Sequence, residues 1–273
     1  MESQMNLYLL TSLFEAKTEE RATEFKECVL GNVANENFAE LIIFFKDKEQ
    51  LPHFWERYDY LRHDKIKVLH TNGRQTFKML FDYANQHLPG HPVVIANGDI
   101  YFDQNSNIES AANIAKGQLC TITRYNYDPE SQEWRLKGNG LIGSHDVWVF
   151  QAPIKEFERD FFIGAVGCDS YLSQKAVEAG ITVLNPCKSI ITKHHHKSVE
   201  RYEQYQPGKF YWDKEDYMIG GQELYLAPPS YLEDNQALKP NLLWHLRYRY
   251  RRFHPLPRKF FSAMRTLLGG LFC

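Results

Sequence analysis

Cysteine is scarce in this chain, and its distribution argues against two kinds of architecture. The 273 residues contain five cysteines, an odd number, and none of them stands in a C-x-x-C pair. Small disulfide-stapled folds and structural zinc sites both need clustered, paired thiols. We therefore expect free thiols and a reducing, cytoplasmic compartment.

Long apolar runs are also missing. No stretch approaches the roughly 20 apolar residues of a membrane-spanning helix. Residues 1–13 lack a basic segment followed by a long apolar one, so we expect no signal peptide. A chain of this length that is 43% hydrophobic can bury a large core, which is typical of one α/β domain with or without an appendage.

Acidic residues are absent from the C-terminal segment. Residues 241–273 contain seven arginines and lysines and no Asp or Glu, although the net charge of the whole chain is −2. If residues 242–253 are helical, they form an apolar stripe flanked by arginines, a pattern that binds anionic membrane surfaces. We expect residues 1–240 to form the folded body and residues 241–273 a basic amphipathic tail. The tail would place the protein on the inner face of the cell membrane; packing on the body or on a second subunit is the alternative.

The charge distribution also bears on nucleic acids. An arginine-rich tail can bind phosphates, but the first 240 residues are acidic overall. We therefore expect no nucleic-acid partner.

Short apolar segments alternate with segments of helical periodicity. Strands are predicted over residues 7–14, 41–45, 66–69 and 93–96, with helices over 19–33 and from 77 onward, and a helix or irregular turn over 50–61. Strand–helix alternation is typical of a mostly parallel sheet flanked by helices. Later predictions are strands over 118–124, 146–150 (half-buried) and 181–186, helices over 108–115 and 170–179, and a polar excursion over 128–139.

The strand predicted at 93–96 runs directly into Asn97-Gly98-Asp99. The carboxyl-terminal edge of an open parallel sheet is where ligands bind. Strand alternation would direct Asn97 and Asp99 to the same side, and Gly98 would leave room for a ligand. These residues are candidates for binding a nucleotide diphosphate; a plain Asn-Gly turn is the alternative. Asp103 either orients Asp99 or contacts a ligand hydroxyl; a turn formed with Asn105 is the alternative.

The run of histidines from 194 to 196 is a second candidate. On a strand, His194 and His196 point one way and His195 the other, so at most two can share a site. Imidazole beside carboxylate suits Mn²⁺ or another borderline divalent cation. A solvated surface is the alternative.

Three further residues precede or follow predicted elements. Asp169 stands just before a predicted helix, where it is either the N-cap or a general base that the helix N-terminus keeps ionised. Arg74, after the third predicted strand, is either a phosphate clamp or an exposed turn residue. Thr11, near the end of the first strand, is a candidate for binding the nucleotide diphosphate.

The order of these motifs carries a resemblance. Arg74-x-Thr-Phe, Phe81-x-Tyr-Ala-Asn85, Ile95 to Asp103, Gly143-Ser-x-Asp-x-Trp-x-Phe150, Gly164-x-x-Gly-Cys-Asp169, Asn185-Pro186 and His194-x-His-x-Ser198 follow one another. Together they resemble glycosyltransferases with the GT-A fold, and are similar to a bacterial group associated with cell-surface polysaccharide synthesis. The likeness covers about residues 5–205.

The resemblance implies that the two halves of the folded body bind different substrates. Residues 1–103 would bind a nucleotide-sugar donor and residues 104–240 a glycan or lipid-linked glycan acceptor. A D-x-D motif usually binds the metal–diphosphate, and here its first acid is an amide, Asn97. The implied ligands of Mn²⁺ or Mg²⁺ are Asp99 with His194 or His196, and the implied base of an inverting transfer is Asp169. The implied donor contacts are Thr11, Arg74, Asn97, Asp99 and Asp103.

Two other classes stay open. A sugar nucleotidyltransferase would share the parallel sheet, but it usually has a glycine-rich phosphate loop after the first strand, and residues 10–14 contain no glycine. A non-catalytic sugar- or nucleotide-binding module would not need Asp99, Asp169 and His196, which are all present.

Overall fold

The computed structural model describes residues 6–47, 53–140, 145–165, 167–195, 227 and 229–232. All of them belong to one compact unit, Met1–Gly220 with Leu224–Ala237. Within these ranges, none of the helices has the length and apolar content needed to cross a bilayer. The predicted tail, residues 241–273, and His196 lie outside the described residues.

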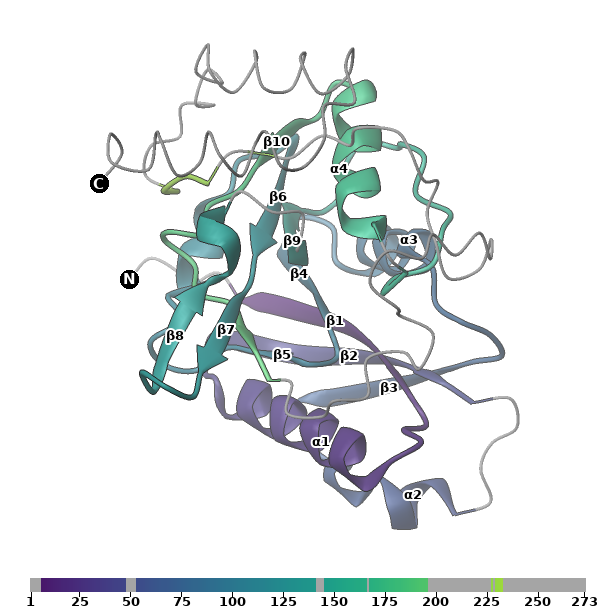
Figure 1. Ribbon diagram of the computed structural model, residues 1–273. Helices are drawn as coiled ribbons and strands as arrows, with labels where there is room; N and C mark the ends of the chain where they lie inside the picture. The colour runs from purple at the N-terminus through teal and green to yellow at the C-terminus, as the bar shows by residue number, and fades with distance from the viewer. Residues whose placement is uncertain are drawn as a thin grey trace, which may run out of the picture. The chain divides into compact units, whose positions relative to one another are not determined.

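The main sheet has seven strands in the order β10-β6-β9-β4-β1-β2-β3 (Figure 1). The first four strands in the chain pair in parallel, β10 pairs in parallel with β6, and β9 runs antiparallel between β4 and β6. The predicted mostly parallel sheet is confirmed. Its strands are β1 (Leu7–Phe14), β2 (Phe38–Lys46), β3 (Ile66–Thr71), β4 (Pro92–Asn97), β6 (Gln118–Thr123), β9 (His145–Gln151) and β10 (Thr182–Leu184).

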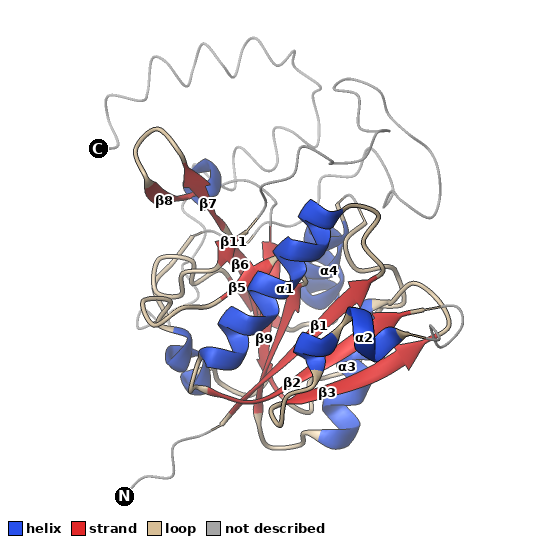
Figure 2. Cartoon of the chain, turned by 90° about the horizontal axis from the view of Figure 1, so that it is seen from below, coloured by secondary structure: helices blue, strands red, loops and turns tan. Residues whose placement is uncertain are grey.

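Helices cover both faces of this sheet. Figure 2 shows α1 and α2 in front of the strands and α3 and α4 behind them. Neighbouring residues of one strand enter opposite cores, Leu9 with the α1 side and Leu10 with the α3 side, because side chains alternate along a strand. The helices are α1 (Glu19–Ala34), α2 (Phe54–Arg57), α3 (Phe77–His87) and α4 (Cys168–Glu178), with 3₁₀ helices η1 (Asp59–Leu61), η2 (Ile108–Asn113) and η3 (Lys137–Gly140).

Strand β9 is buried on both faces, whereas the sequence predicted a half-buried strand. All seven of its residues are buried. Val147 and Val149 pack in the α1-side core, and Trp148 and Phe150 pack in the α3-side core. Insertion between β4 and β6 gives β9 a helical layer on each side, which leaves no solvent-facing row.

A second, four-stranded sheet has the order β5-β11-β7-β8. The segment predicted as a polar excursion, residues 128–139, contains β8 and the turn that joins it to β7 in a hairpin; the Asp128 side chain holds this turn. Strand β11 pairs antiparallel with β5, and His194 lies opposite Ile100. This sheet therefore brings the histidine segment beside the residue that follows Asp99. Its strands are β5 (Ile100–Tyr101), β7 (Tyr125–Asp128), β8 (Glu133–Leu136) and β11 (Lys193–His194).

A buried asparagine of α1, Asn32, and the residue that caps its C-terminus, Asn35, bind β5 and the residue that follows it. The Asn32 amide donates to the carbonyl of Ile100 at 3.0 Å, and its oxygen accepts the N–H of Phe102 at 2.9 Å. The Asn35 amide donates to the carbonyl of Phe102 at 3.1 Å. Helix α1 thus fixes the backbone that follows Asp99. The four cysteines within the described ranges are free and buried.

Candidate functional site

The chain turns immediately after β4, at Gly98 and Asp99. A Cβ atom on Gly98 would lie 2.9 Å from the carbonyl oxygen of Ser12 and 2.6 Å from Cδ2 of Leu13. Close packing against β1 therefore requires glycine at position 98. Because of the turn, strand alternation does not extend from Asn97 to Asp99, and the two side chains have different partners.

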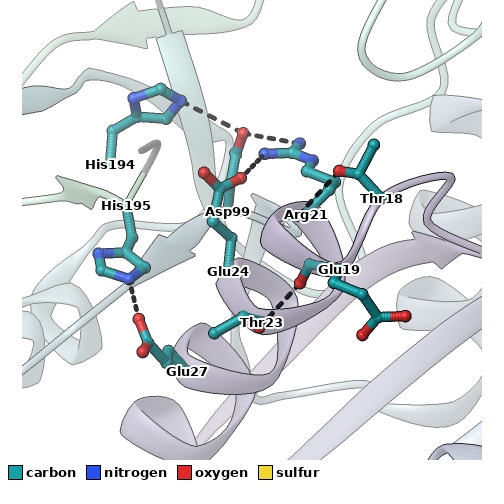
Figure 3. Close-up of polar contacts among 9 residues, drawn as sticks. All are labelled: Thr18, Glu19, Arg21, Thr23, Glu24, Glu27, Asp99, His194 and His195. Carbon is teal, nitrogen blue, oxygen red and sulfur yellow. Dashed lines mark hydrogen bonds and ion pairs between the residues drawn. The ribbon is translucent and has the colours of Figure 1, made fainter. Parts of the chain in front are cut away.

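Asp99 lies in a buried cluster of charged groups (Figure 3). Its Oδ2 is 3.0 Å from Nη2 of Arg21 and 3.2 Å from Nε2 of His194. Arg21 also reaches Oε2 of Glu24 at 2.8 Å, through Nη1. His195, next to His194, contacts Glu27 instead, as strand alternation predicts.

The charges in this cluster keep Asp99 ionised. Burial opposes ionisation of its carboxyl, but His194 and Arg21 outweigh that cost and hold its pKa well below its usual range. A carboxylate beside an imidazole is a donor set that divalent cations accept. Two of the predicted ligands, Asp99 and His194, are thus together, and their oxygen and nitrogen donors fit a borderline divalent cation better than Mg²⁺, which prefers oxygen ligands.

The cation site is incomplete within the part of the chain that the structure describes. There, no three His, Cys, Asp or Glu side chains are grouped so that they could hold a metal ion. His196, the other predicted ligand, is outside these ranges. Arg21 contacts Oδ2 of Asp99, the same oxygen that His194 contacts. Arg21 was not recognised from the sequence, because its partner is 78 residues away.

Asn97 belongs to a different cluster. Its Nδ2 donates to Oδ1 of Asp146 at 2.7 Å, and Nη1 of Arg124 donates to Oδ2 of Asp146 at 2.8 Å. Asp146 and Arg124 are 8% and 7% exposed. Sequence reasoning missed both residues, although an acid at the start of an apolar strand was a usable signal.

Asp169 is not the N-cap of α4, as one sequence interpretation held. The N-cap is Gly167, whose positive φ of 82° suits a residue without Cβ, and Asp169 lies in the first turn. Oδ2 of Asp169 accepts the peptide N–H of His145 at 3.0 Å. The structure therefore links the start of α4 to the start of β9.

Asp169 is only partly ionised at neutral pH, whereas the sequence interpretation had the helix N-terminus keep it fully charged. Burial, followed by the negative charge of Asp146, raises the pKa of Asp169 to about 7. Backbone N–H groups, among them that of His145, act in the opposite direction but do not outweigh burial. A carboxyl with this pKa exchanges its proton near neutral pH.

Arg74 lies near the start of α4. Its guanidinium stacks over the ring of Phe162, 5.1 Å from the centroid. The neighbouring backbone is bonded to the segment that leads into α4, because the N–H of Ile163 donates to the carbonyl of Gln75 at 3.1 Å. Burial and Asp169 raise the pKa of Cys168, and Arg74 opposes that rise, which places its charge within range of this helix turn.

The two remaining candidates are part of the folded framework. Thr11 pairs with β2 and β4 in the middle of the sheet and is 5% exposed. Asp103 accepts the N–H of Asn105 at 3.0 Å, which is the turn considered as an alternative, and it also pairs with Lys193. The structure thus brings Asp99 together with His194, and links Asn97 and Asp169 to successive residues at the start of β9.

Comparisons with known proteins identify the fold. No known family model matches the chain, and no curated protein does. Among solved structures, GalNAc-T7 with UDP, GalNAc and Mn²⁺ is similar with a TM-score of 0.50 and 12% identity, over 79% of this chain and 47% of that one. Mannosyltransferase PcManGT from Pyrobaculum calidifontis, in complex with GDP-Man and Mn²⁺, gives a TM-score of 0.48 at 9% identity, over 73% of this chain and 59% of that one. This chain therefore spans about half the length of these two proteins, and it has the fold of the GT-A glycosyltransferases.

Proposed function

We propose that this protein is a glycosyltransferase that moves a sugar from a nucleotide-sugar donor to a hydroxyl group of a glycan or lipid-linked glycan. The observation that carries the proposal is the meeting of Asp99 and His194 at the turn after β4, in a GT-A fold. Both similar structures hold a nucleotide or nucleotide sugar with Mn²⁺. The pathway we propose is cell-surface polysaccharide synthesis.

The donor diphosphate would bind at the Asp99 turn. Asp99 and His194 would hold a divalent cation, with His196 as a further candidate ligand. When bound, the cation neutralises the charge of the diphosphate leaving group. Arg21 supplies positive charge beside Asp99, and Arg74 lies near the start of α4, where a guanidinium can bind a phosphate oxygen.

Asp169 would act as the base of an inverting transfer. The acceptor oxygen forms a bond to the anomeric carbon while the bond from that carbon to the phosphate oxygen breaks, and the diphosphate leaves with the electron pair. The acceptor's proton passes to the Asp169 carboxylate. A pKa of about 7 suits this step, because such a group is partly ionised at neutral pH and still a strong enough base.

We further propose that the enzyme works at the inner face of the cell membrane. The support is the basic amphipathic sequence of residues 241–273. Each basic residue near an anionic surface adds about 1 kcal/mol. Flotation with anionic liposomes at low salt should recover the full chain and lose a chain truncated after Pro240. Equal recovery of the two in the soluble fraction would contradict the membrane role.

The transferase proposal is tested by screening nucleotide sugars by calorimetry, with and without Mn²⁺. We expect at least one donor to bind, and Asp99→Ala to weaken that binding. Absence of any nucleotide diphosphate or nucleotide sugar binding at millimolar concentration would refute the proposal. Pyrophosphate release from a nucleoside triphosphate and a sugar phosphate would identify a nucleotidyltransferase instead. Donor binding without transfer to any acceptor would favour a binding module.

A further inference from the structure

We propose that Asp146 is a positioning residue for Asp169, and that residue 97 is an amide because it must donate a hydrogen bond to Asp146. The inference rests on the proposed role of Asp169 as the base. It concerns three residues on three different elements, β4, β9 and α4, and it gives a reason for the departure from the D-x-D pattern.

Asp146 is held by donors from both sides of its strand. Asn97 ends β4 and Arg124 directly follows β6, the two strands that flank β9. Each contributes one hydrogen bond to a different carboxylate oxygen, at 2.7 and 2.8 Å. Because hydrogen bonds to a carboxylate are short and directional, this arrangement fixes the orientation of the Asp146 side chain.

The residue before Asp146 holds Asp169. The peptide N–H of His145 donates to Oδ2 of Asp169 at 3.0 Å. His145 and Asp146 are consecutive at the start of β9, so the bonds that fix Asp146 also fix this N–H. The orientation of the proposed base therefore depends on Asn97 and Arg124, neither of which has a direct bond to it here.

Asp146 also acts on Asp169 through its charge. Burial and Asp146 together raise the pKa of Asp169. Among the described residues, the other ionisable groups near the start of α4 include Cys168, whose thiol is kept neutral by burial and Asp169, Arg124, which is paired with Asp146, Arg74, and His145. Burial lowers the pKa of His145 to about 4, so its ring is neutral at pH 7 and does not offset Asp146.

An acid at position 97 would disturb this arrangement. Nδ2 of Asn97 is now 2.7 Å from Oδ1 of Asp146. Asn97→Asp would replace this nitrogen with a carboxylate oxygen and so bring two carboxylates into contact. Two carboxylates at that distance cannot both be ionised, so one of them would bind a proton or the strand ends would separate. The amide is therefore required by the cluster that Asp146 forms.

Three variants test the inference: Asp146→Asn, Asn97→Asp, and the double variant that exchanges acid and amide. The first readout is the pKa of Asp169 from a carboxyl carbon NMR titration, assigned with Asp169→Asn. We expect Asp146→Asn to lower this pKa by about 1 or more. Exposed Asp160, in the segment before α4, gives a matched control, since Asp160→Asn should leave the pKa unchanged.

The second readout is the denaturation midpoint, which keeps the test decisive if Asp146→Asn folds poorly. Asn97→Asp should lower the midpoint at pH 7, and the double variant should recover most of that loss, because it again pairs one amide with one acid. An unchanged Asp169 pKa in Asp146→Asn, or a double variant no more stable than Asn97→Asp, would overturn the inference.

Neither readout requires turnover, so failure of this inference and failure of the transferase proposal are distinguishable. A chain that binds no donor but shows the Asp169 pKa change would refute only the transferase. In an active enzyme, Asp146→Asn should move the acid limb of the kcat–pH profile to lower pH. A purely structural role would lower kcat without moving that limb.

Discussion

Arg21 Nη2 lies 3.0 Å from Oδ2 of Asp99, so the first turn of α1 is bonded to the turn that follows β4. The side chain of Arg21 is 20% exposed and that of Asp99 is 12% exposed. The same guanidinium contacts Glu24, which is almost fully buried. One cation therefore serves two buried acids beside the place proposed for the donor diphosphate.

Replacing this cation should destabilise the protein. Arg21→Met removes the guanidinium while both acids stay buried, so we expect the free energy of unfolding to fall by about 2–4 kcal/mol in urea denaturation. Arg57→Met is the control, because Arg57 pairs with Glu15 at the surface, and it should cost less than about 1 kcal/mol. Equal losses would show that the Arg21 pairs contribute no more than surface pairs.

Cation binding should depend on Asp99 and be opposed by Arg21. Asp99→Asn should weaken Mn²⁺ binding by about tenfold or more in calorimetry, because it removes the charge of one ligand. Arg21→Met should strengthen Mn²⁺ binding, because it removes a positive charge 3.0 Å from Oδ2 of Asp99. Asp64→Asn, at an exposed position, is the control. Full turnover in excess chelator would contradict a metal role, and Arg21 or Arg74 would then neutralise the charge of the diphosphate.

Turnover should depend on Asp169. Asp169→Asn keeps the size of the side chain but cannot accept a proton, so kcat should fall by about 10²–10⁴ while the KM for the donor changes little. The variant should fold, because an amide oxygen can still accept the N–H of His145. Asp160→Asn serves as the control. A rate near that of the wild type would remove Asp169 from the mechanism.

The pH dependence of stability should show Asp169 and His145 with opposite signs. The pKa of Asp169 is raised from 3.8 to about 7. Its contribution to the free energy of unfolding is therefore fully present below about pH 4 and is lost as the pH rises to 7. The pKa of His145 is lowered from 6.5 to about 4, so its contribution is present above pH 6.5 and is lost as the pH falls to 4.

A comparison of Asp169→Asn with the wild type isolates the first effect. Between pH 4 and 7, the variant should gain stability relative to the wild type by about 1.4 kcal/mol per pH unit. Urea denaturation at four pH values across this interval measures the difference. A difference that does not change with pH would mean that Asp169 has an ordinary pKa in the folded protein.

Two glycines give a matched test of packing at the Asp99 turn. Gly98→Ala would place Cβ against the carbonyl of Ser12 and the side chain of Leu13, so we expect a loss of about 1–3 kcal/mol in unfolding free energy. Gly73→Ala has open space around the new Cβ and should stay within about 0.5 kcal/mol of the wild type. Similar values for both would mean that the β4 turn relaxes freely.

Local patterns were sufficient to predict most of the main sheet. The apolar runs at β1 and β4 and the start of α3 depend on neighbouring residues, and they were predicted close to their observed bounds. The β7–β8 hairpin was missed, because its faces carry polar and aromatic residues instead of a clean apolar alternation.

The site was only partly predictable for a related reason. The resemblance in the order of the motifs predicted that Asp99 and His194 lie together, but the sequence did not identify Arg21 or Asp146 as members of the site. Their partners are 78 and 49 residues away. The packing of α1 on the sheet brings Arg21 to Asp99, and strand order brings Asp146 to Asn97. Ion pairs of this kind follow from tertiary packing and leave little trace in a single sequence.

The amides of Asn32 and Asn35 have a consequence for ligand binding. They hold the backbone of β5 from one end of α1, while Arg21 reaches Asp99 from the other. A ligand that displaces Arg21 therefore meets a turn whose backbone is already held in place. The conformational entropy of that turn is lost when the protein folds, so binding need not oppose it again. In this sense α1 preorganises the turn, and affinity for a ligand there depends on residues that never contact it.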